Sequence, residues 1–179
     1  TPACDALAPW ITLSVSNWQD ETRSLTVDLS NVGTLSSSAQ YAVFELRTQQ
    51  FLGVLSGDAT LQLDVPAHGT RILRLAQWEN DPLIIGTDLH LSGGGVELCD
   101  VFTEGASISG RVETSWDYPV TVTALFPNGD SPRLAWARVG AGGLFAIGDS
   151  AQPQAFASEA GSTGRTPCDA IPRNNDGGE

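Results

Sequence analysis

Apolar and polar residues alternate along most of the chain with a period of two, which is typical of strands with one buried face. In the segment SLTVDLSN, Leu25, Val27 and Leu29 share one face, and Thr26 and Asp28 share the other. The same alternation occurs in four further segments of the first half, at residues 10–17, 41–48, 59–66 and 70–77. Strands are therefore predicted about every ten residues, a spacing typical of an antiparallel sandwich or barrel.

A second group of predicted strands follows the polar segment QWENDP at residues 77–82. Its members are LIIG, GVELCDVF, ASISGRVE, YPVTVTALF, RLAWARVG and GLFAIG. The segment PNGDSP at residues 127–132 predicts a hairpin turn, because Asn128 and Gly129 tolerate positive φ. No stretch of helical length has apolar residues at i, i+3, i+4 and i+7, so little helix is expected.

These patterns predict an all-β fold, an antiparallel β-sandwich with a second, smaller β-region packed against it. The predicted organisation is a sandwich domain at residues 1–78, a hairpin-rich β-region at residues 82–148 and an irregular tail at residues 149–179. The tail is rich in Gly, Ser, Pro and Asp and has no strand periodicity. One sandwich and two abutting β-domains produce the same pattern, so that alternative stays open.

The composition limits the possible partners. Hydrophobic residues make up 41% of the 179 positions and charged residues 17%, which provides enough apolar material for a sizeable core. All nine basic residues are arginine, and the formal net charge of −12 repels nucleic acid and anionic lipid. No run approaches the roughly 20 apolar residues that a membrane-spanning helix needs. We therefore expect no nucleic-acid partner, no membrane span and no cofactor.

Three cysteines are an odd number. Cys4 and Cys168 lie near opposite ends of the chain, and the termini of compact domains are often close together. In an exported protein a Cys4–Cys168 disulfide would tie these ends together, and the chain-entropy model values it at about 4–5 kcal/mol. Cys99 would then be a small buried hydrophobic residue. The chain starts at Thr1 without an apolar leader, so we expect a mature secreted, extracellular chain or a piece of a larger protein.

The segment IIGTDLHLSGGGVELCD, residues 84–100, gathers side chains that often carry chemistry. Asp88 and His90 are two positions apart, so on a strand they would share a face and could both bind a metal. Two ligands are too few, and no cysteine has the close-set partners of a zinc centre. We expect no metal site, with Thr87 and Asp88 bonding nearby backbone N–H groups. The glycines precede VELCDVF, which alternates like a strand, so they predict a tight connection rather than a phosphate-binding loop.

Two adjacent stretches resemble a known family. They are FLGVLSGDATLQLDVPAHGTRILRL at residues 51–75, and GTDLHLSGGGVELCDV at residues 86–101 followed by ISGRVETSWDYPVTVTALFPNG at residues 108–129. Together these strand-and-turn motifs resemble the C-terminal antiparallel β-domain of the α-galactosidase (melibiase) clan of glycoside hydrolases. The resemblance covers roughly residues 10–130. It implies a domain that covers the flank of a catalytic barrel, stabilises the barrel and helps to position the polysaccharide.

The resemblance brings no catalytic residue with it. In that family the nucleophile and the acid/base are aspartates at strand ends of the barrel, and a (β/α)₈ barrel needs about 250 residues. Nothing in this sequence corresponds to the barrel. Glu97 and Glu113 alternate on predicted strands and are expected to be solvated rather than paired across a sugar. We therefore expect no enzymatic activity from this chain alone; if it is a fragment, the parent would be a glycoside hydrolase.

Five tryptophans are many for a chain with 7% aromatic residues. Indole faces stack on the C–H faces of sugars, so an exposed tryptophan in a loop indicates carbohydrate contact. Trp18 in SNWQDE and Trp116 in TSWDYP have turn-like surroundings and are the candidates for that contact. For any single tryptophan the alternative is a structural role, pinning a corner of the sandwich.

The sequence supports three hypotheses. The first is a non-catalytic accessory domain of a secreted, α-galactosidase-like glycoside hydrolase, with the catalytic barrel or a carbohydrate as its partner. The second is a stand-alone carbohydrate-binding module. The third is a structural subunit of an extracellular β-sandwich assembly, such as a surface layer or filament, in which edge strands mediate self-assembly.

Overall fold

The computed structural model describes residues 7–89, 94–115, 117–129, 131–148 and 154–155. Within these residues the chain forms strands throughout, with one short 3₁₀ turn, η2 (Leu29–Asn31), and no α-helix. The strands of the first half, residues 7–78, are β1 (Trp10–Ser16), β2 (Arg23–Asp28), β3 (Gln40–Glu45), β4 (Gln50–Ser56), β5 (Thr60–Val65) and β6 (Thr70–Gln77). Those that follow are β7 (Leu83–Thr87), β8 (Leu98–Glu104), β9 (Ser107–Val112), β10 (Val120–Phe126), β11 (Arg133–Val139), β12 (Leu144–Gly148) and β13 (Gln154–Ala155).

The strands form four antiparallel sheets. Sheet A has the order β1-β6-β3-β4, and sheet B consists of β2 and β5. Sheet C has the order β11-β10-β7, and sheet D has the order β13-β12-β9-β8. The all-β prediction is therefore confirmed, and so is the second β-region packed against the sandwich. Among the described residues no helix has the length and hydrophobicity needed to cross a bilayer.

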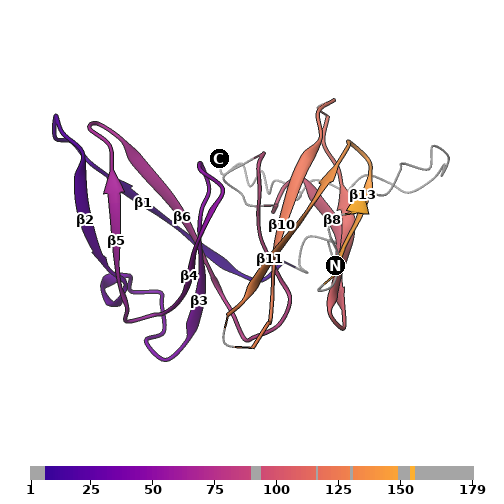
Figure 1. Cartoon of the computed structure of the whole chain (residues 1–179), viewed down its shortest axis with the longest axis horizontal. Coiled ribbons are helices and arrows are strands. Elements are labelled where there is room, and N and C mark those ends of the chain that lie inside the picture. Colours follow the sequence, from indigo (N-terminus) through magenta and orange to yellow (C-terminus); the bar gives the residue numbers. More distant parts are fainter. Residues whose placement is uncertain (1–6, 90–93, 116, 130, 149–153, 156–179) are drawn as a thin grey trace, which may run out of the picture.

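The sheets stack in the order B, A, C, D, as the strand labels show across Figure 1. Three apolar clusters fill the spaces between them. Leu63 of sheet B packs with Leu73 and Leu75 of sheet A, and Phe44 of sheet A packs with Leu125 of sheet C. The third and largest cluster lies between sheets C and D. The two halves of the chain thus meet through sheets A and C.

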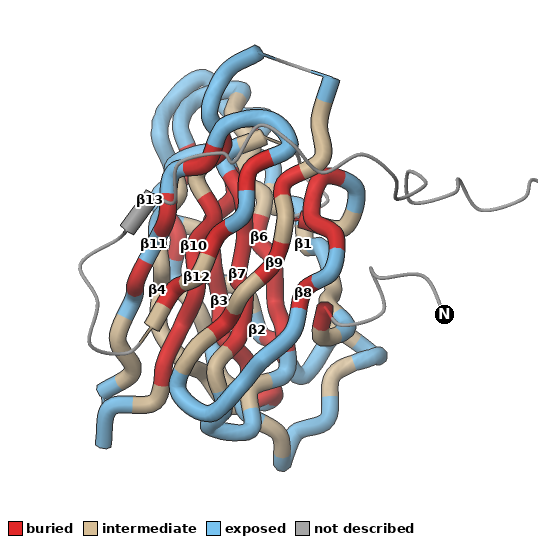
Figure 2. Tube along the Cα trace, turned by 90° about the vertical axis from the view of Figure 1, so that its right-hand side faces the viewer, coloured by how far each residue is buried: buried red, intermediate tan, exposed pale blue. Residues whose placement is uncertain are grey.

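Strands β3, β7 and β10 of the two inner sheets are buried on both faces, whereas β11 of sheet C keeps one exposed face. In β3 every residue after Gln40 is buried, and in β7 all five residues are buried. In Figure 2, seen from the sheet D side, buried residues lie mainly along the strands and many of the connections are exposed. The expectation of one buried face is therefore wrong for these strands, because each inner sheet has another sheet on either side. A continuous apolar run such as LIIG is the sequence pattern of such strands.

Two turn predictions are confirmed. The β10–β11 hairpin has Gly129 at φ +57°, and Ser131 N donates to Asn128 O at 3.2 Å. Gly94, at φ +108°, begins a turn that leads directly into strand β8, so a tight connection replaces any phosphate-binding loop. Gly86 has another role. A Cβ added there would lie 2.9 Å from the Phe44 ring, so this glycine allows sheets A and C to approach closely.

Strand β4 was missing from the predicted set. Its register with β3 shifts between Val43 and Phe44, where Gly53 adopts φ +121°. This bulge inserts an extra residue and breaks the period of two on which the prediction depended.

Candidate functional site

The loop at residues 17–22, called the Trp18 loop below, connects β1 to β2. Trp18 is 80% exposed, the highest value among the large hydrophobic side chains that the structure describes as exposed. Its turn-like context in the sequence therefore corresponds to an exposed ring. No sandwich corner covers it, in contrast to the structural role weighed above.

Asn17 fixes this loop from below. It is buried, and its side-chain N–H groups donate to the carbonyls of Glu21 at 2.8 Å and of Val65 and Pro66 at 3.0 Å. Its Oδ1 accepts a hydrogen bond from the Gln19 N–H at 3.0 Å. One side chain thus holds both the Trp18 loop and the β5–β6 connection. Buried polar groups with all partners present make a region rigid.

The β5–β6 connection supports the same loop from the side. His68 has φ +50°, and its backbone N–H donates to Gln19 O at 3.3 Å. Its Nε2 lies 2.9 Å from Asp20 Oδ1, with both side chains well exposed. The loop that carries the exposed indole is therefore tied to the β5–β6 connection by a backbone hydrogen bond and by the contact between His68 and Asp20.

A cleft of 460 Å³ opens at the other end of β1. Ile11, Tyr41 and Leu75 belong to its lining, and the connection between the two halves forms a wall with Trp78, Glu79, Asp81 and Pro82. The remaining lining residues are Ala8, Pro9, Trp10, Thr34, Gln77 and Leu83. Its volume is within the range of about 300–1,000 Å³ that small-molecule sites occupy.

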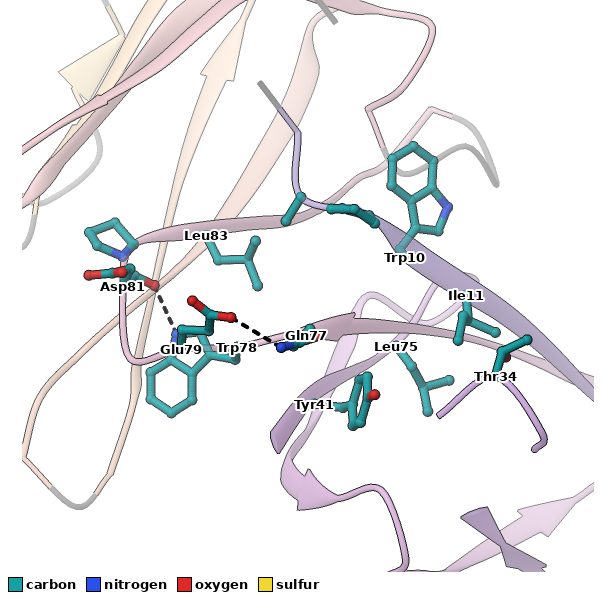
Figure 3. Close-up of a pocket in the computed structure, with 13 residues that line it drawn as sticks. Trp10, Ile11, Thr34, Tyr41, Leu75, Gln77, Trp78, Glu79, Asp81 and Leu83 are labelled. Atoms are coloured by element: carbon teal, nitrogen blue, oxygen red, sulfur yellow. Dashed lines mark hydrogen bonds between the residues drawn. The ribbon is translucent and has the colours of Figure 1, made fainter. Parts of the chain in front are cut away.

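The wall of this cleft is held by two hydrogen bonds, both drawn in Figure 3. Trp78 Nε1 donates to Asp81 O at 2.9 Å, which closes the turn. Gln77 Nε2 donates to Glu79 Oε1 at 3.1 Å. The ring of Trp78 lies beside Glu79, whereas the indole of Trp10 points away from both. Sequence reasoning missed this site, although the segment QWENDP, with its tryptophan and two acids, was a visible signal.

The segment at residues 84–100 forms a structural junction. Asp88 Oδ1 accepts a hydrogen bond from Thr121 N at 2.7 Å, and Asp88 N donates to Thr121 O at 3.2 Å. The backbone bond expected for Asp88 is thus present. His90 lies outside the described residues. Within the part of the chain that is described, no three His, Cys, Asp or Glu side chains group as metal ligands would.

Glu97 corrects one expectation from the sequence. It is buried rather than solvated, and its carboxylate accepts a hydrogen bond from the Thr87 hydroxyl, which was expected to bond to backbone instead. The physical reason lies on strand β6, where Arg74 is fully buried between sheets A and C. The Arg74 guanidinium lies 4.5 Å from the centre of the Trp10 ring. A buried cation needs an opposite charge nearby, and Glu97 supplies it.

The burial of Arg74 changes its titration. Loss of solvent lowers its pKa to about 10, and the negative charge of Glu97 opposes that change. Arg74 therefore carries its positive charge at physiological pH. The charged group lies in the contact between the two halves.

Glu45 is a second buried carboxylate, at the end of β3. Burial alone would raise its pKa, but hydrogen bonds from the hydroxyl and N–H of Thr48 and from the N–H of Ile72 and Arg47 together lower it. The carboxylate thus stays ionised and caps the β3–β4 turn. Its hydrogen bonds explain why this carboxylate is buried, without a role in proton transfer.

Arg111 binds two further carboxylates, those of Asp100 and Glu113. Its guanidinium lies 3.3 Å from Asp100 Oδ2 and also pairs with Glu113. Glu113 is half-buried, and its Oε2 lies 3.4 Å from the thiol of Cys99. Cys99 is buried, as expected for a small hydrophobic residue.

Three predicted site residues fall outside the described part of the chain. They are Trp116, Cys4 and Cys168. The carbohydrate contact at Trp116 and the disulfide therefore stay predictions.

Comparisons with known proteins give limited information. No protein-family model matches the chain, and no curated protein matches it. Among solved structures, the crystal structure of alpha-galactosidase I from Mortierella vinacea is 30% identical over the matched part, with a TM-score of 0.32. The match covers 37% of this chain and 17% of that one. It is a weak structural similarity to part of a much longer protein.

Proposed function

We propose that this chain is a non-catalytic β-sandwich accessory domain of a secreted glycoside hydrolase and that it contacts carbohydrate through Trp18. The observation that carries the proposal is the 80% exposed indole on a loop fixed by buried Asn17. The strand-and-turn motifs that resemble the C-terminal domain of the α-galactosidase clan support the same assignment.

An exposed tryptophan on a rigid loop favours binding for two reasons. Leaving a large apolar ring in water gives up the free energy of burying it, so such a ring commonly marks a contact surface. A loop that is already ordered loses little conformational freedom when it binds, and this increases affinity. Asp20 on the same loop and His68 on the neighbouring connection are exposed polar side chains that suit the hydroxyls of a sugar.

The carboxylates support a non-catalytic role. Glycoside hydrolysis needs two carboxyl groups about 5–9 Å apart across one sugar subsite. Glu45 and Glu97 are buried and bonded to Thr48 and Thr87, and Arg111 pairs with Glu113. These groups have structural partners rather than an open subsite between them.

Affinity electrophoresis in gels that contain soluble polysaccharides tests the proposal. Binding should slow the wild-type protein in at least one neutral polysaccharide, and Trp18→Ala should restore its mobility. Trp136→Ala is the matched control, because Trp136 is also exposed, at 49%, but lies on strand β11. Equal retardation of wild type and Trp18→Ala, or no retardation in any polysaccharide, would remove the proposed contact.

A structural subunit of an extracellular assembly is the second candidate. The observation in its favour is on the outer face of sheet D, where Phe102 and Leu144 are 56% and 60% exposed. They border a depression of 300 Å³ over Ser109 and Ala146. Sedimentation velocity over a range of concentrations separates the two candidates. Concentration-dependent association that Phe102→Ser and Leu144→Ser abolish would favour the assembly.

A further inference from the structure

We infer that the cleft beside Trp78 is a second ligand site, which accepts one neutral sugar residue. It goes beyond the proposed Trp18 contact, since the two sites lie at opposite ends of β1. Seven residues of strand separate them, which is about 20 Å. The two sites share only the chemical class of their ligand.

The cleft exists because sheet B covers only part of sheet A. Leu13 and Val15 of β1 pack in the cluster between these sheets, but Ile11, two residues earlier on the same face, lines the cleft instead. Ile11 is opposite Leu75 in the register of β1 and β6. The floor therefore lies at the edge of the cluster between the two sheets, where Leu75 is still covered and Ile11 is half-buried.

The lining combines an apolar floor with hydrogen-bond acceptors. Ile11 and Trp78, both half-buried, offer apolar surface to the C–H face of a sugar ring, and Leu75 and Tyr41 are buried beneath it. Glu79 and Asp81, both exposed, offer carboxylate oxygens to hydroxyl donors. Apolar contact on one side and a few placed polar groups on the other are the usual features of small-molecule sites.

Charge selects against acidic ligands. Among the described residues no Arg or His lines the cleft, whereas two carboxylates do, and the whole chain has a net charge of −12. A uronic acid or a phosphate would approach two negative groups without a compensating cation.

The arrangement of rings selects against a cation site. Recognition of an ammonium group by aromatic side chains needs rings whose faces enclose the cation. In Figure 3 the indole of Trp10 points away from Trp78, so no cage forms. The guanidinium of Arg74 lies 4.5 Å from the centre of the Trp10 ring, so this ring already has a cationic partner. A neutral, hydroxyl-rich ring fits these groups better than either charged class.

Nuclear magnetic resonance titration of the full chain tests the inference. The probes are galactose, glucose and mannose, with galacturonate and glucosamine as the acidic and basic counterparts. At least one neutral sugar should shift the amide signals of residues 75–83, with millimolar affinity. The Glu79→Gln, Asp81→Asn double variant should weaken that binding about tenfold, because two charge-assisted hydrogen bonds become neutral ones. Both substitutions keep the side-chain shape at exposed positions, and the spectrum itself reports whether the variant is folded.

Trp18→Ala separates this site from the proposed contact, since it should leave the shifts at residues 75–83 unchanged. Loss of those shifts in Trp18→Ala would overturn a separate second site. The inference is also overturned if neutral sugars at about 100 mM, far above a millimolar dissociation constant, shift no signal of the cleft. Equal or tighter binding of galacturonate or glucosamine, or unchanged affinity in the double variant, would likewise overturn it.

Discussion

The two halves of the molecule share one plan but differ in how completely their outer sheet covers the inner one. Sheet B has two strands of six residues, whereas sheet D has β8, β9 and β12 together with the short β13. Ile11 lies beyond the cluster between sheets B and A and lines the cleft, and the two proposed contact sites lie at the two ends of β1. The difference teaches that a binding surface can arise from incomplete cover, without an inserted loop or a special motif.

The contact between the halves differs from the cores within them. Apolar side chains pack between sheets A and C, but the same contact also holds Arg74, Thr87 and Glu97. Apolar packing tolerates small shifts of one sheet on another, whereas the attraction between the buried charges of Arg74 and Glu97 favours one arrangement. We interpret the pair as the element that sets the position of one half on the other.

The largest expected effect comes from breaking that pair. Glu97→Ala leaves the charge of Arg74 buried without its counterion and should lower the free energy of unfolding by about 3–5 kcal/mol. The double variant Arg74→Met, Glu97→Gln should recover most of this loss, because no charge then remains inside. Urea denaturation measures both. Glu104→Ala, at an exposed position of β8, is the control and should change stability by less than about 0.5 kcal/mol. Additive losses in the double variant would contradict the pairing.

An intermediate effect is expected at the Trp18 end of β1. Asn17→Ala removes the side-chain donor to the carbonyls of Val65 and Pro66, of which Pro66 keeps the bond from Gly69 N, and should cost about 1–3 kcal/mol. Amide hydrogen exchange should become faster in residues 17–22 and 66–69 and stay unchanged in residues 75–83 at the cleft. Asn31→Ala, at an exposed position of η2, is the matched control. Uniform acceleration along the whole first half would mean that Asn17 supports the fold rather than the loop.

The smallest effect concerns acid stability. The pKa of Glu45 is lowered in the folded protein, so the unfolded state binds protons more readily. The stability that this carboxylate contributes is therefore complete above its ordinary pKa of 4.5 and is lost as pH falls through the lower, folded value. Glu45→Gln should flatten the decline between neutral and acid pH, measured by urea denaturation at several pH values. Thr48→Val, which removes one of the hydrogen bonds to Glu45, should flatten it in part. An unchanged slope in both variants would contradict this assignment.

Strand positions were predictable from the sequence because alternation is a local property. The segments at residues 10–17, 59–66 and 70–77 contain β1, β5 and β6 almost residue for residue. The stacking of four sheets was not predictable, since the period of two says which residues share a face but not what covers that face. YAVFEL in β3 was read as alternating, although its apolar run is broken only by Glu45, which is itself buried.

The two candidate sites also differ in how far the sequence reveals them. Trp18 was predictable because its neighbours are turn residues, and exposure follows from them. The cleft depends on where sheet B ends above sheet A, and that brings Ile11, Tyr41 and Asp81 together from distant parts of the sequence. Arg74 was missed because an arginine in an alternating strand is normally assigned to the solvent face.

The pairing of β1 with β6 has a consequence for the order in which the protein is built. Trp10 pairs with Ala76, and Ser16 with Thr70, so β1 has no strand partner until residues 70–77 have been synthesised. At roughly 5–20 residues per second, the first strand waits for several seconds on the ribosome. The strand that carries Trp18 at one end and the cleft at the other is thus among the last of its half to be fixed. A nascent chain interrupted before residue 70 would have neither surface in place, so affinity for a ligand would report that this half has completed its folding.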